Sequence, residues 1–430
     1  MERGRSRRTS LAAPRLTGRL EQRWELPNGV RLIAHQIPSA YSVTLGIWVV
    51  GGSCDEEPAY NGTAHMLEHL LAGSSQRHTA RQLALAFERL GTEVNAYTTK
   101  ELTCYHAQTL PDRLPRVLQL LTEQLFSPRL SQRLLARERR VITEELLAYA
   151  DDPEELLYEH AERLLFENHP LGMPIAGTPE SVQRITLGVL QDFHRRFYVG
   201  ERIVVTLVGN LPPEEALRAA AAVFADIPRQ HCQLPARVPP QPQRAREETL
   251  CRPFQQASLL IARLLPRLSA PERTALAILN FVLGEGWGSR LYQRLRERHG
   301  LVYNITSELE WYSTCGVWSI SASTSPGTLP RVEELIFEEL RHLSNGGIRP
   351  EEFERGRAFL HARLAMALDS PAECMTLLAR AALEQEPTPL PELLELQLSQ
   401  LSRDTVDMLA ALYCQPGDWS RVRLLPSNDA

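Results

Sequence analysis

Two histidines and a glutamate lie close together in the segment HMLEH, residues 65–69. His65 and His69 are four residues apart, so on a helix they share one face, one turn apart. Two imidazoles placed in this way can hold one Zn²⁺, which in a catalytic site takes three protein ligands and leaves a fourth position for water. Glu68 lies on the same side and can take a proton from that water without being a ligand. The order HxxEH therefore predicts a zinc-activated water, and the alternative is an ordinary helix with two histidines.

A third zinc ligand is expected from the segment 131–150, SQRLLARERRVITEELLAYA. Its apolar residues recur at helical spacing, which predicts a helix. Glu138 and Glu145 are seven residues apart, or two turns, and so face the same way. A carboxylate is the ligand type that a His₂Glu site still lacks. On the residues alone either glutamate could be the ligand, and both could instead lie on a solvated face.

The segment HMLEH with Glu145, 76 positions after His69, resembles the insulinase-like (pitrilysin) zinc metallopeptidases. The similarity points to the branch of short chains that includes the mitochondrial processing peptidase. It covers nearly the whole chain after residue 22 and continues through NAYTTKELTCY at 95–105, NHPLGMPIAGTPES at 168–181 and LRERHGLVY at 295–303. The resemblance implies that Glu145 is the third zinc ligand. It also implies that Glu138 is an acidic residue near the metal that supports catalysis.

The same resemblance assigns four residues to substrate binding. In the family, the strand that matches Asn95 and Ala96 is a sheet edge to which the substrate adds as an extra strand. Arg296 and Tyr303 match an arginine–tyrosine pair that binds the substrate main chain near the scissile bond. Without the family, Asn95 would be a turn residue in a meander, Arg296 a surface arginine and Tyr303 a strand residue in the core.

Composition limits the class of protein. The chain has 430 residues, of which 43% are apolar, so a globular protein of two domains is expected. A net charge of −5 argues against nucleic acid as a partner, and the absence of long apolar runs argues against a membrane span. The seven cysteines show no CxxC spacing, which favours reduced thiols in a reducing compartment. We expect the bacterial cytoplasm, with an organelle matrix as the alternative, because residues 1–20 are basic but lack a signal-peptide core.

A repeat in the sequence predicts an α+β fold of two homologous domains, each an antiparallel-dominated sheet with helices packed over it. The tetrapeptides ERLG and ERHG, at 88–91 and 297–300, each end a predicted helix before two strands and a copy of LPRV. The second copy has no HxxEH, and GSRLYQRL at 288–295 is expected in its place. The segment LGMPIAGTPES, at 171–181, is expected to be a loop.

Four prolines make the segment 234–248 a stiff, extended linker. The predicted division is a basic flexible extension at 1–22, a zinc-binding catalytic domain at 23–233, the linker, and a second domain at 249–430 that contributes substrate-binding residues.

Together these features predict a zinc-dependent endopeptidase that acts on unfolded peptides. His65, His69 and Glu145 would hold Zn²⁺, while Glu68 would take a proton from the zinc-bound water and return one to the leaving amine. Because family enzymes work as four-domain clamshells, a homodimer is expected, with a heterodimer of related chains as the alternative. A maturation protease subunit working with a partner chain and a non-catalytic structural homologue are the other functions considered.

Overall fold

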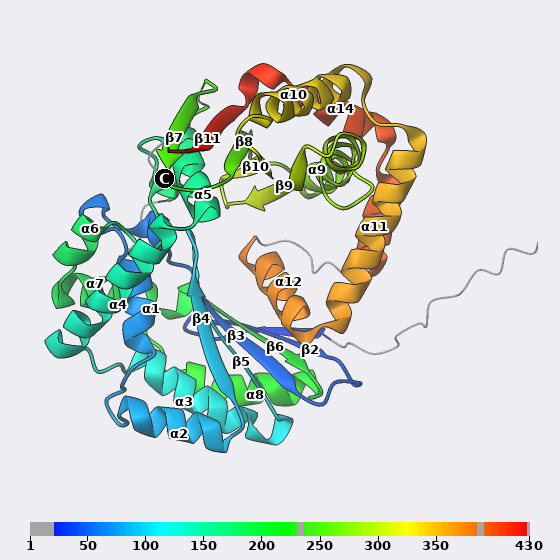
Figure 1. The fold of residues 1–430 in the computed structure, drawn as a ribbon. Coiled ribbons are helices and arrows are strands. Elements are labelled where there is room, and N and C mark those ends of the chain that lie inside the picture. Colours follow the sequence, from blue (N-terminus) through cyan, green and yellow to red (C-terminus); the bar gives the residue numbers. More distant parts are fainter. Residues whose placement is uncertain (1–20, 230–235, 243, 385–390, 428–430) are drawn as a thin grey trace, which may run out of the picture.

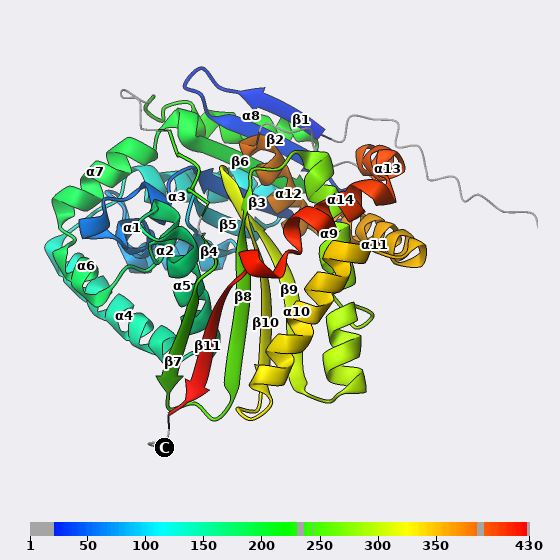
Figure 2. The ribbon, with the colours of Figure 1, turned by 90° about the horizontal axis from the view of Figure 1, so that it is seen from above.

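The computed structural model describes residues 21–229, 236–242, 244–384 and 391–427, and shows the α+β fold that the sequence predicts. Two sheets, each mixed but mostly antiparallel, lie in the two halves of the molecule with helices around them (Figure 1). In the orientation of Figure 2 the strands of the second sheet run side by side, with α9 and α10 on one side of them.

The first sheet is built around a fully buried central strand, β3 (Val43–Val49). Its order is β1-β2-β6-β3-β5-β4, and only β2 and β6 pair in parallel. The other strands are β1 (Glu21–Glu25), β2 (Arg31–Gln36), β4 (Glu93–Thr98), β5 (Thr103–Thr109) and β6 (Ile203–Gly209). The edge predicted for the strand that carries Asn95 and Ala96 is therefore confirmed, because β4 ends the sheet.

The second sheet repeats this pattern. Its order is β7-β11-β8-β10-β9, again with one parallel pair, β7 and β11. The strands are β7 (Glu247–Arg252), β8 (Ala257–Pro266), β9 (Val302–Trp311), β10 (Cys315–Thr324) and β11 (Ser420–Pro426). Gly91 and Gly300, which follow the helices before β4 and β9, share a φ of +59°, the left-handed conformation that glycine adopts without strain. The predicted repeat is thus visible in the backbone.

Helices cover both sheets. In the first half they are α1 (Thr63–Leu71), α2 (Ala80–Arg89), α3 (Leu114–Phe126), α4 (Gln132–Ala150), α5 (Pro153–Phe166), α6 (Pro179–Arg184), α7 (Leu187–Phe197) and α8 (Pro213–Phe224). In the second half they are α9 (Ala270–Leu283), the π-helix η6 (Tyr292–Arg298), α10 (Leu329–Gly346), α11 (Pro350–Asp369), α12 (Pro371–Leu383), α13 (Pro391–Gln400) and α14 (Arg403–Tyr413). Both copies of LPRV begin a helix, α3 and α10.

The two halves exchange one helix each. Helix α5 packs against β8 and β11 of the second sheet, and α12 packs against β3 and β6 of the first (Figure 1). Apolar side chains make these contacts: Leu157 and Leu260 belong to one buried cluster, and Met375 and Trp48 belong to another. The predicted division of the chain at 234–248 stays a prediction, and residues 234, 235 and 243 of that segment lie outside the described residues.

Two local predictions are wrong. Thr178 caps α6, so the last residues of the expected loop at 171–181 already form a helix. The segment 288–295 does not take the place of HMLEH, because α9 packs against α11 and α14 as α1 packs against α4 and α7. The π-helix that follows lies over β9 as α2 lies over β4. The tetrapeptide matches could not show whether α9 or the π-helix is the equivalent of α1, because such matches give the spacing along the chain but not which helices pack together.

Candidate metal centre

Helices α1 and α4 bring the candidate ligands together because each buries one apolar face. The buried side chains of α1 include Met66, Leu67 and Leu70, which leaves the histidines on the side that meets α4. Helix α4 starts at the predicted place, since the hydroxyl of Ser131 accepts from the backbone N–H of Leu134.

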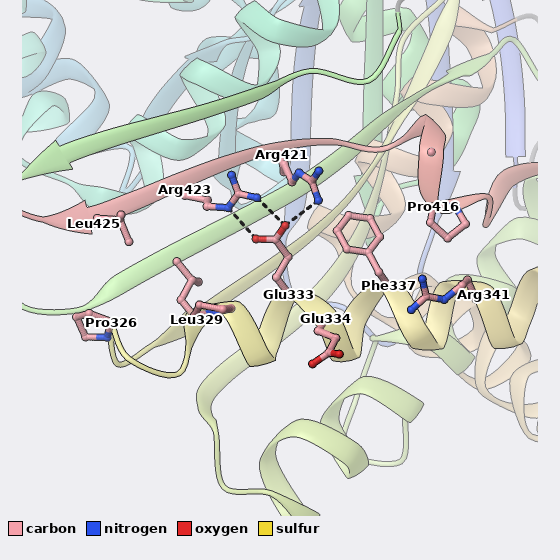
Figure 3. A pocket seen from close by; sticks show the side chains of 12 residues that line it. Pro326, Leu329, Glu333, Glu334, Phe337, Arg341, Pro416, Arg421, Arg423 and Leu425 are labelled. Carbon is pink, nitrogen blue, oxygen red and sulfur yellow. Dashed lines mark hydrogen bonds and ion pairs between the residues drawn. The ribbon is translucent and has the colours of Figure 1, made fainter.

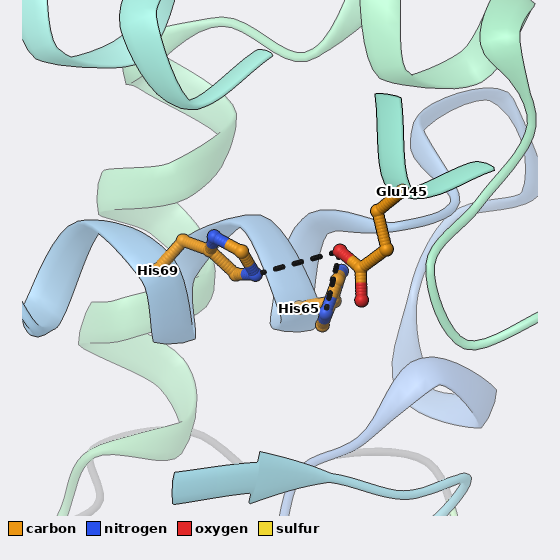
Figure 4. Close-up of side chains that lie close together, drawn as sticks. All are labelled: His65, His69 and Glu145. Carbon is orange, nitrogen blue, oxygen red and sulfur yellow. Dashed lines mark ion pairs between the residues drawn. The ribbon is translucent and has the colours of Figure 1, made fainter. Parts of the chain in front are cut away.

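Three side chains converge between these helices, as Figure 4 shows. Ligand atoms of His65, His69 and Glu145 all lie within 4.8 Å of one another. Oε2 of Glu145 is 3.7 Å from Nε2 of each histidine, too far for a hydrogen bond. Atoms that share a tetrahedral Zn²⁺ at its usual bond lengths lie about 3.4 Å apart. The spacing and the donor types therefore fit one zinc ion.

The environment also keeps the cluster in a metal-binding state. Burial, and then the neighbouring His69, lower the pKa of His65 to about 4, so its ring is neutral near pH 7. Neutral imidazole is the form that binds metals. Oε2 of Glu145 is buried without a hydrogen-bond partner in the described part of the chain, which a bound cation would satisfy.

Glu138 lies beside the cluster. Its Oε2 is 3.4 Å from Nδ1 of His69, the ring nitrogen that does not face Glu145, and its Oε1 accepts from the guanidinium of Arg137. A carboxylate placed behind a ligating histidine fixes the tautomer and the orientation of the ring. Of the two glutamates that the sequence left open, the structure thus brings Glu145 into the cluster and Glu138 against His69.

Glu68 points from α1 towards the edge strand β4. Its Oε2 accepts a hydrogen bond of 2.6 Å from Oγ1 of Thr98, and burial raises its pKa. A raised carboxyl pKa makes a stronger base, which suits proton transfer near neutral pH. Sequence reasoning did not find Thr98, because nothing in the local pattern links it to a helix 30 residues earlier.

Tyr149 is a second residue that sequence reasoning missed. Its hydroxyl donates to Oε1 of Glu145, the oxygen that does not face the histidines. The contact could have been expected from the spacing, since residues four apart on a helix are neighbours.

A cavity of about 530 Å³ opens from this cluster between α1, α2 and β4. Glu68, His69 and Glu138 lie on its wall, together with Asn95 and Ala96. Its apolar lining includes Leu83, Phe87, Val94 and Leu125. The volume is that of an ordinary ligand site and can hold a large side chain. The structure thus places the two edge-strand residues at the same cavity as the candidate base.

Arg296 and Tyr303 lie together in the second half. The guanidinium of Arg296 is 5.6 Å from the ring centre of Tyr303 and 5.1 Å from that of Tyr292, on the π-helix. The side chain of Tyr303 is 78% exposed, so it is not a core residue of its strand. The pair is therefore open to a ligand, although it does not line the cavity beside His69.

A larger cavity, of about 860 Å³, lies between α10 and β11 (Figure 3). The carboxylate of Glu333 bonds to the guanidinium groups of both Arg421 and Arg423 there. The charge of Glu333 is thus paired within the protein, and none of the predicted site residues lines this cavity. The smaller cavity is the one that lies next to the candidate ligand His69.

Among the described residues, no helix is both long and apolar enough to cross a lipid bilayer.

Comparisons with known proteins agree with this geometry. Residues 31–179 match the family model "Insulinase (Peptidase family M16)", and residues 184–360 match "Peptidase M16 inactive domain". An uncharacterised zinc protease of Mycobacterium leprae is 33% identical over 91% of this chain and 88% of its own length. The beta subunit of the mitochondrial-processing peptidase of Saccharomyces cerevisiae is 27% identical over 93% of this chain and 90% of that subunit. The crystal structure of a protease from Helicobacter pylori shares the fold, with a TM-score of 0.88 at 22% identity over 94% of this chain and 99% of that one.

Proposed function

We propose that this chain, which belongs to the insulinase family of peptidases (M16), is a zinc-dependent endopeptidase that cleaves extended peptides. The observation that carries the proposal is the cluster of His65, His69 and Glu145, whose ligand atoms have the spacing of a zinc site. The same cluster argues against a non-catalytic homologue, which would have no need for two buried histidines facing an unpartnered carboxylate oxygen.

The proposed chemistry divides between the metal and Glu68. Zinc, when bound by His65, His69 and Glu145, supplies the Lewis acid that polarises the scissile carbonyl and acidifies a water. Thr98 holds Oε2 of Glu68, which leaves Oε1 to accept a proton from that water and to pass it to the leaving amine. Glu138 keeps the ring of His69 oriented throughout.

Substrate binding is proposed at the edge of the first sheet. An extended peptide pairs with the main chain of β4 at Asn95 and Ala96, while one of its side chains enters the cavity beside His69. Main-chain pairing places little demand on sequence, so we expect the cavity to set the cleavage preference. Arg296 and Tyr303 then hold the substrate main chain from the opposite side.

We also propose that two copies of the chain form the working enzyme. Both the zinc cluster and the Arg296–Tyr303 pair are present in one chain, so a two-fold dimer can place the second half of one copy over the cluster of the other. The exposure of Tyr303 supports this arrangement, because an aromatic ring in water gains from a partner.

Complementation tests the dimer. Glu68→Gln and Arg296→Ala chains are each expected to be weakly active alone. After mixing and subunit exchange they should regain part of the activity, because one of the two sites in a mixed dimer is intact. Exchange without any recovery, or an active species that sediments as a monomer, would rule out sites shared between copies.

A maturation protease subunit is the second candidate. It is favoured by the likeness to a mitochondrial-processing peptidase subunit, whose name describes one chain of a larger enzyme. Under this alternative the purified chain alone would be inactive and would need a related partner chain.

The six cysteines that the structure describes are all free, which supports our further proposal that the protein works in the bacterial cytoplasm.

The activity itself is tested with a peptide library. Products are identified by mass spectrometry with and without a zinc chelator, and Glu68→Gln serves as the matched inactive protein. Cleavage that stops with chelator and returns with Zn²⁺ supports the proposal. Cleavage that survives in both controls would contradict it.

A further inference from the structure

The first turn of α1, the helix that carries His65 and His69, is hydrogen-bonded to a carboxylate that lies outside the helix. Oε2 of Glu56 accepts from the backbone N–H of Gly62 at 2.7 Å and from Nδ2 of Asn61 at 2.9 Å. Its Oε1 accepts from the backbone N–H of Ala64 at 2.6 Å. Ala64 directly precedes the ligand His65. Glu56 therefore satisfies N–H groups that the start of a helix leaves free, and it does so next to the metal cluster.

Helix α1 cannot supply this cap from its own N-cap position. Gly62 has a φ of +95°, and a Cβ at this position would lie 2.6 Å from the carbonyl oxygen of Ala176. Serine, aspartate or asparagine, the usual capping residues, are thus excluded there by both strain and space. The cap has to come from another segment, and Glu56 provides it.

The segment that carries Glu56 is itself fixed. Its neighbour Asp55 accepts two hydrogen bonds from the guanidinium of Arg237, at 3.1 and 2.6 Å. Arg237 also donates to the carbonyl of Glu101, at the turn between β4 and β5. The backbone N–H of Cys54 bonds to the carbonyl of Lys100 in the same turn. The segment that carries Glu56 thus links α1 to the turn between β4 and β5.

Fold stability alone is a poor explanation for this arrangement. The side chain of Glu56 is buried, with the residue 9% exposed; burial raises its pKa, and the three hydrogen bonds to its oxygens oppose this change by favouring the charged form. Burying a carboxylate is unfavourable unless hydrogen bonds or an opposite charge replace its lost hydration. Here those bonds set where α1 begins, and so how its histidines face α4.

We propose that Glu56 is a positioning residue of the zinc site, which fixes the start of α1 and thereby the place of His65 relative to Glu145. The inference rests on the proposed function. Outer partners that orient metal ligands change metal affinity by about 10- to 100-fold when they are removed. Glu56 would act in this way through the helix backbone rather than through a ligand side chain.

The test measures zinc affinity of the folded apoprotein by competition with a chelating dye. Glu56→Gln keeps the size of the side chain but can offer only one acceptor oxygen, so it should bind zinc about 10-fold more weakly than the wild type. Glu56→Ala should weaken binding further. Glu57→Gln, the exposed neighbour, is the matched control and should leave the affinity unchanged.

Circular dichroism and melting of the apoproteins separate positioning from folding. A lower melting temperature of Glu56→Gln with unchanged zinc affinity would overturn the proposal, because Glu56 would then only stabilise the fold. Should both Glu56 variants fail to fold, Arg237→Gln frees the segment but keeps Glu56; a loss of zinc affinity supports the proposal and unchanged affinity overturns it. A wild-type chain that binds no zinc would instead reject the proposed function, and this inference with it.

Discussion

Each half of the molecule contains a pair of packed helices in an equivalent position, but the residues between the two helices are polar in one half and apolar in the other. In the first half, α1 and α4 meet through His65, His69 and Glu145, with an unpartnered carboxylate oxygen between them. In the second half, α9 and α11 meet through the rings of Phe281 and Phe359, stacked with their centres 4.2 Å apart. The architecture therefore tolerates either a polar cluster or an apolar contact between these helices.

The helix pair of the second half is packed more closely than the helix pair that carries the candidate metal ligands. At Gly356 of α11 a Cβ would lie 2.7 Å from the side chain of Ile278 on α9, so these two helices pack as closely as their backbones allow. In the first half neither α1 nor α4 contains a glycine, and the polar residues His65 and Glu138 are buried between them. Buried polar groups are unfavourable unless they are paired or bind a metal. We infer that the second half secures its fold by packing, and that the first half gives up packing to hold a cation.

The largest effect is expected from a substitution on α1 that removes the candidate base and leaves the packing of the helix unchanged. Glu68→Gln should keep zinc but lose peptidase activity by about 10²- to 10⁴-fold, the usual effect of removing a general base. Turnover of a reporter peptide and zinc content are measured on the same sample. The exposed Glu144→Gln on α4 serves as the control. Near-normal turnover in a variant that retains its metal would show that another group is the base.

A smaller effect is expected from breaking the apolar contact of the second half. Phe281→Ala should lower the free energy of unfolding by about 3 kcal/mol, because it removes a buried, stacked ring. Zinc content should not change, since the cluster lies in the other helix pair. Urea unfolding followed by fluorescence measures the loss. If zinc content falls while stability holds, the division of roles between the two helix pairs is wrong.

The smallest effect is expected from Glu138→Gln, which tests whether the carboxylate beside His69 contributes to zinc affinity. Glu138→Gln should weaken zinc binding by about 10- to 100-fold without changing the stoichiometry at excess metal, because it removes the charge behind His69. Titration against a competing chelator gives the affinity. A complete loss of zinc would mean that Glu138 is itself a ligand, and unchanged affinity would mean that its contact with His69 has no effect.

Local patterns predicted much of this site. The spacing of HMLEH placed its histidines on one face of a helix, and Ser131 marked the start of α4. Alternation in residues 92–110 predicted the two strands that became β4 and β5. These features depend on neighbours in the chain, so the sequence carries them directly.

The features that the sequence could not predict depend on how helices and strands that are distant in the chain pack against one another. Glu138 and Glu145 share a face of α4, and only the packing of α4 on α1 decides which of them meets both histidines. Glu56 lies in a turn nine residues before His65, with no periodicity to link it to the helix that it caps. The exchange of α5 and α12 between the sheets is likewise a matter of long-range packing.

Zinc content gives the most direct test of the central claim, that His65, His69 and Glu145 form one metal site. Elemental analysis is carried out on the wild type, on Glu145→Gln and on the neighbouring control Glu144→Gln, each shown to be folded. We predict one zinc per chain in the wild type and in the control, and loss of zinc in Glu145→Gln. Full zinc occupancy in folded Glu145→Gln would contradict the assignment of the third ligand, and a wild type without zinc would contradict the claim as a whole.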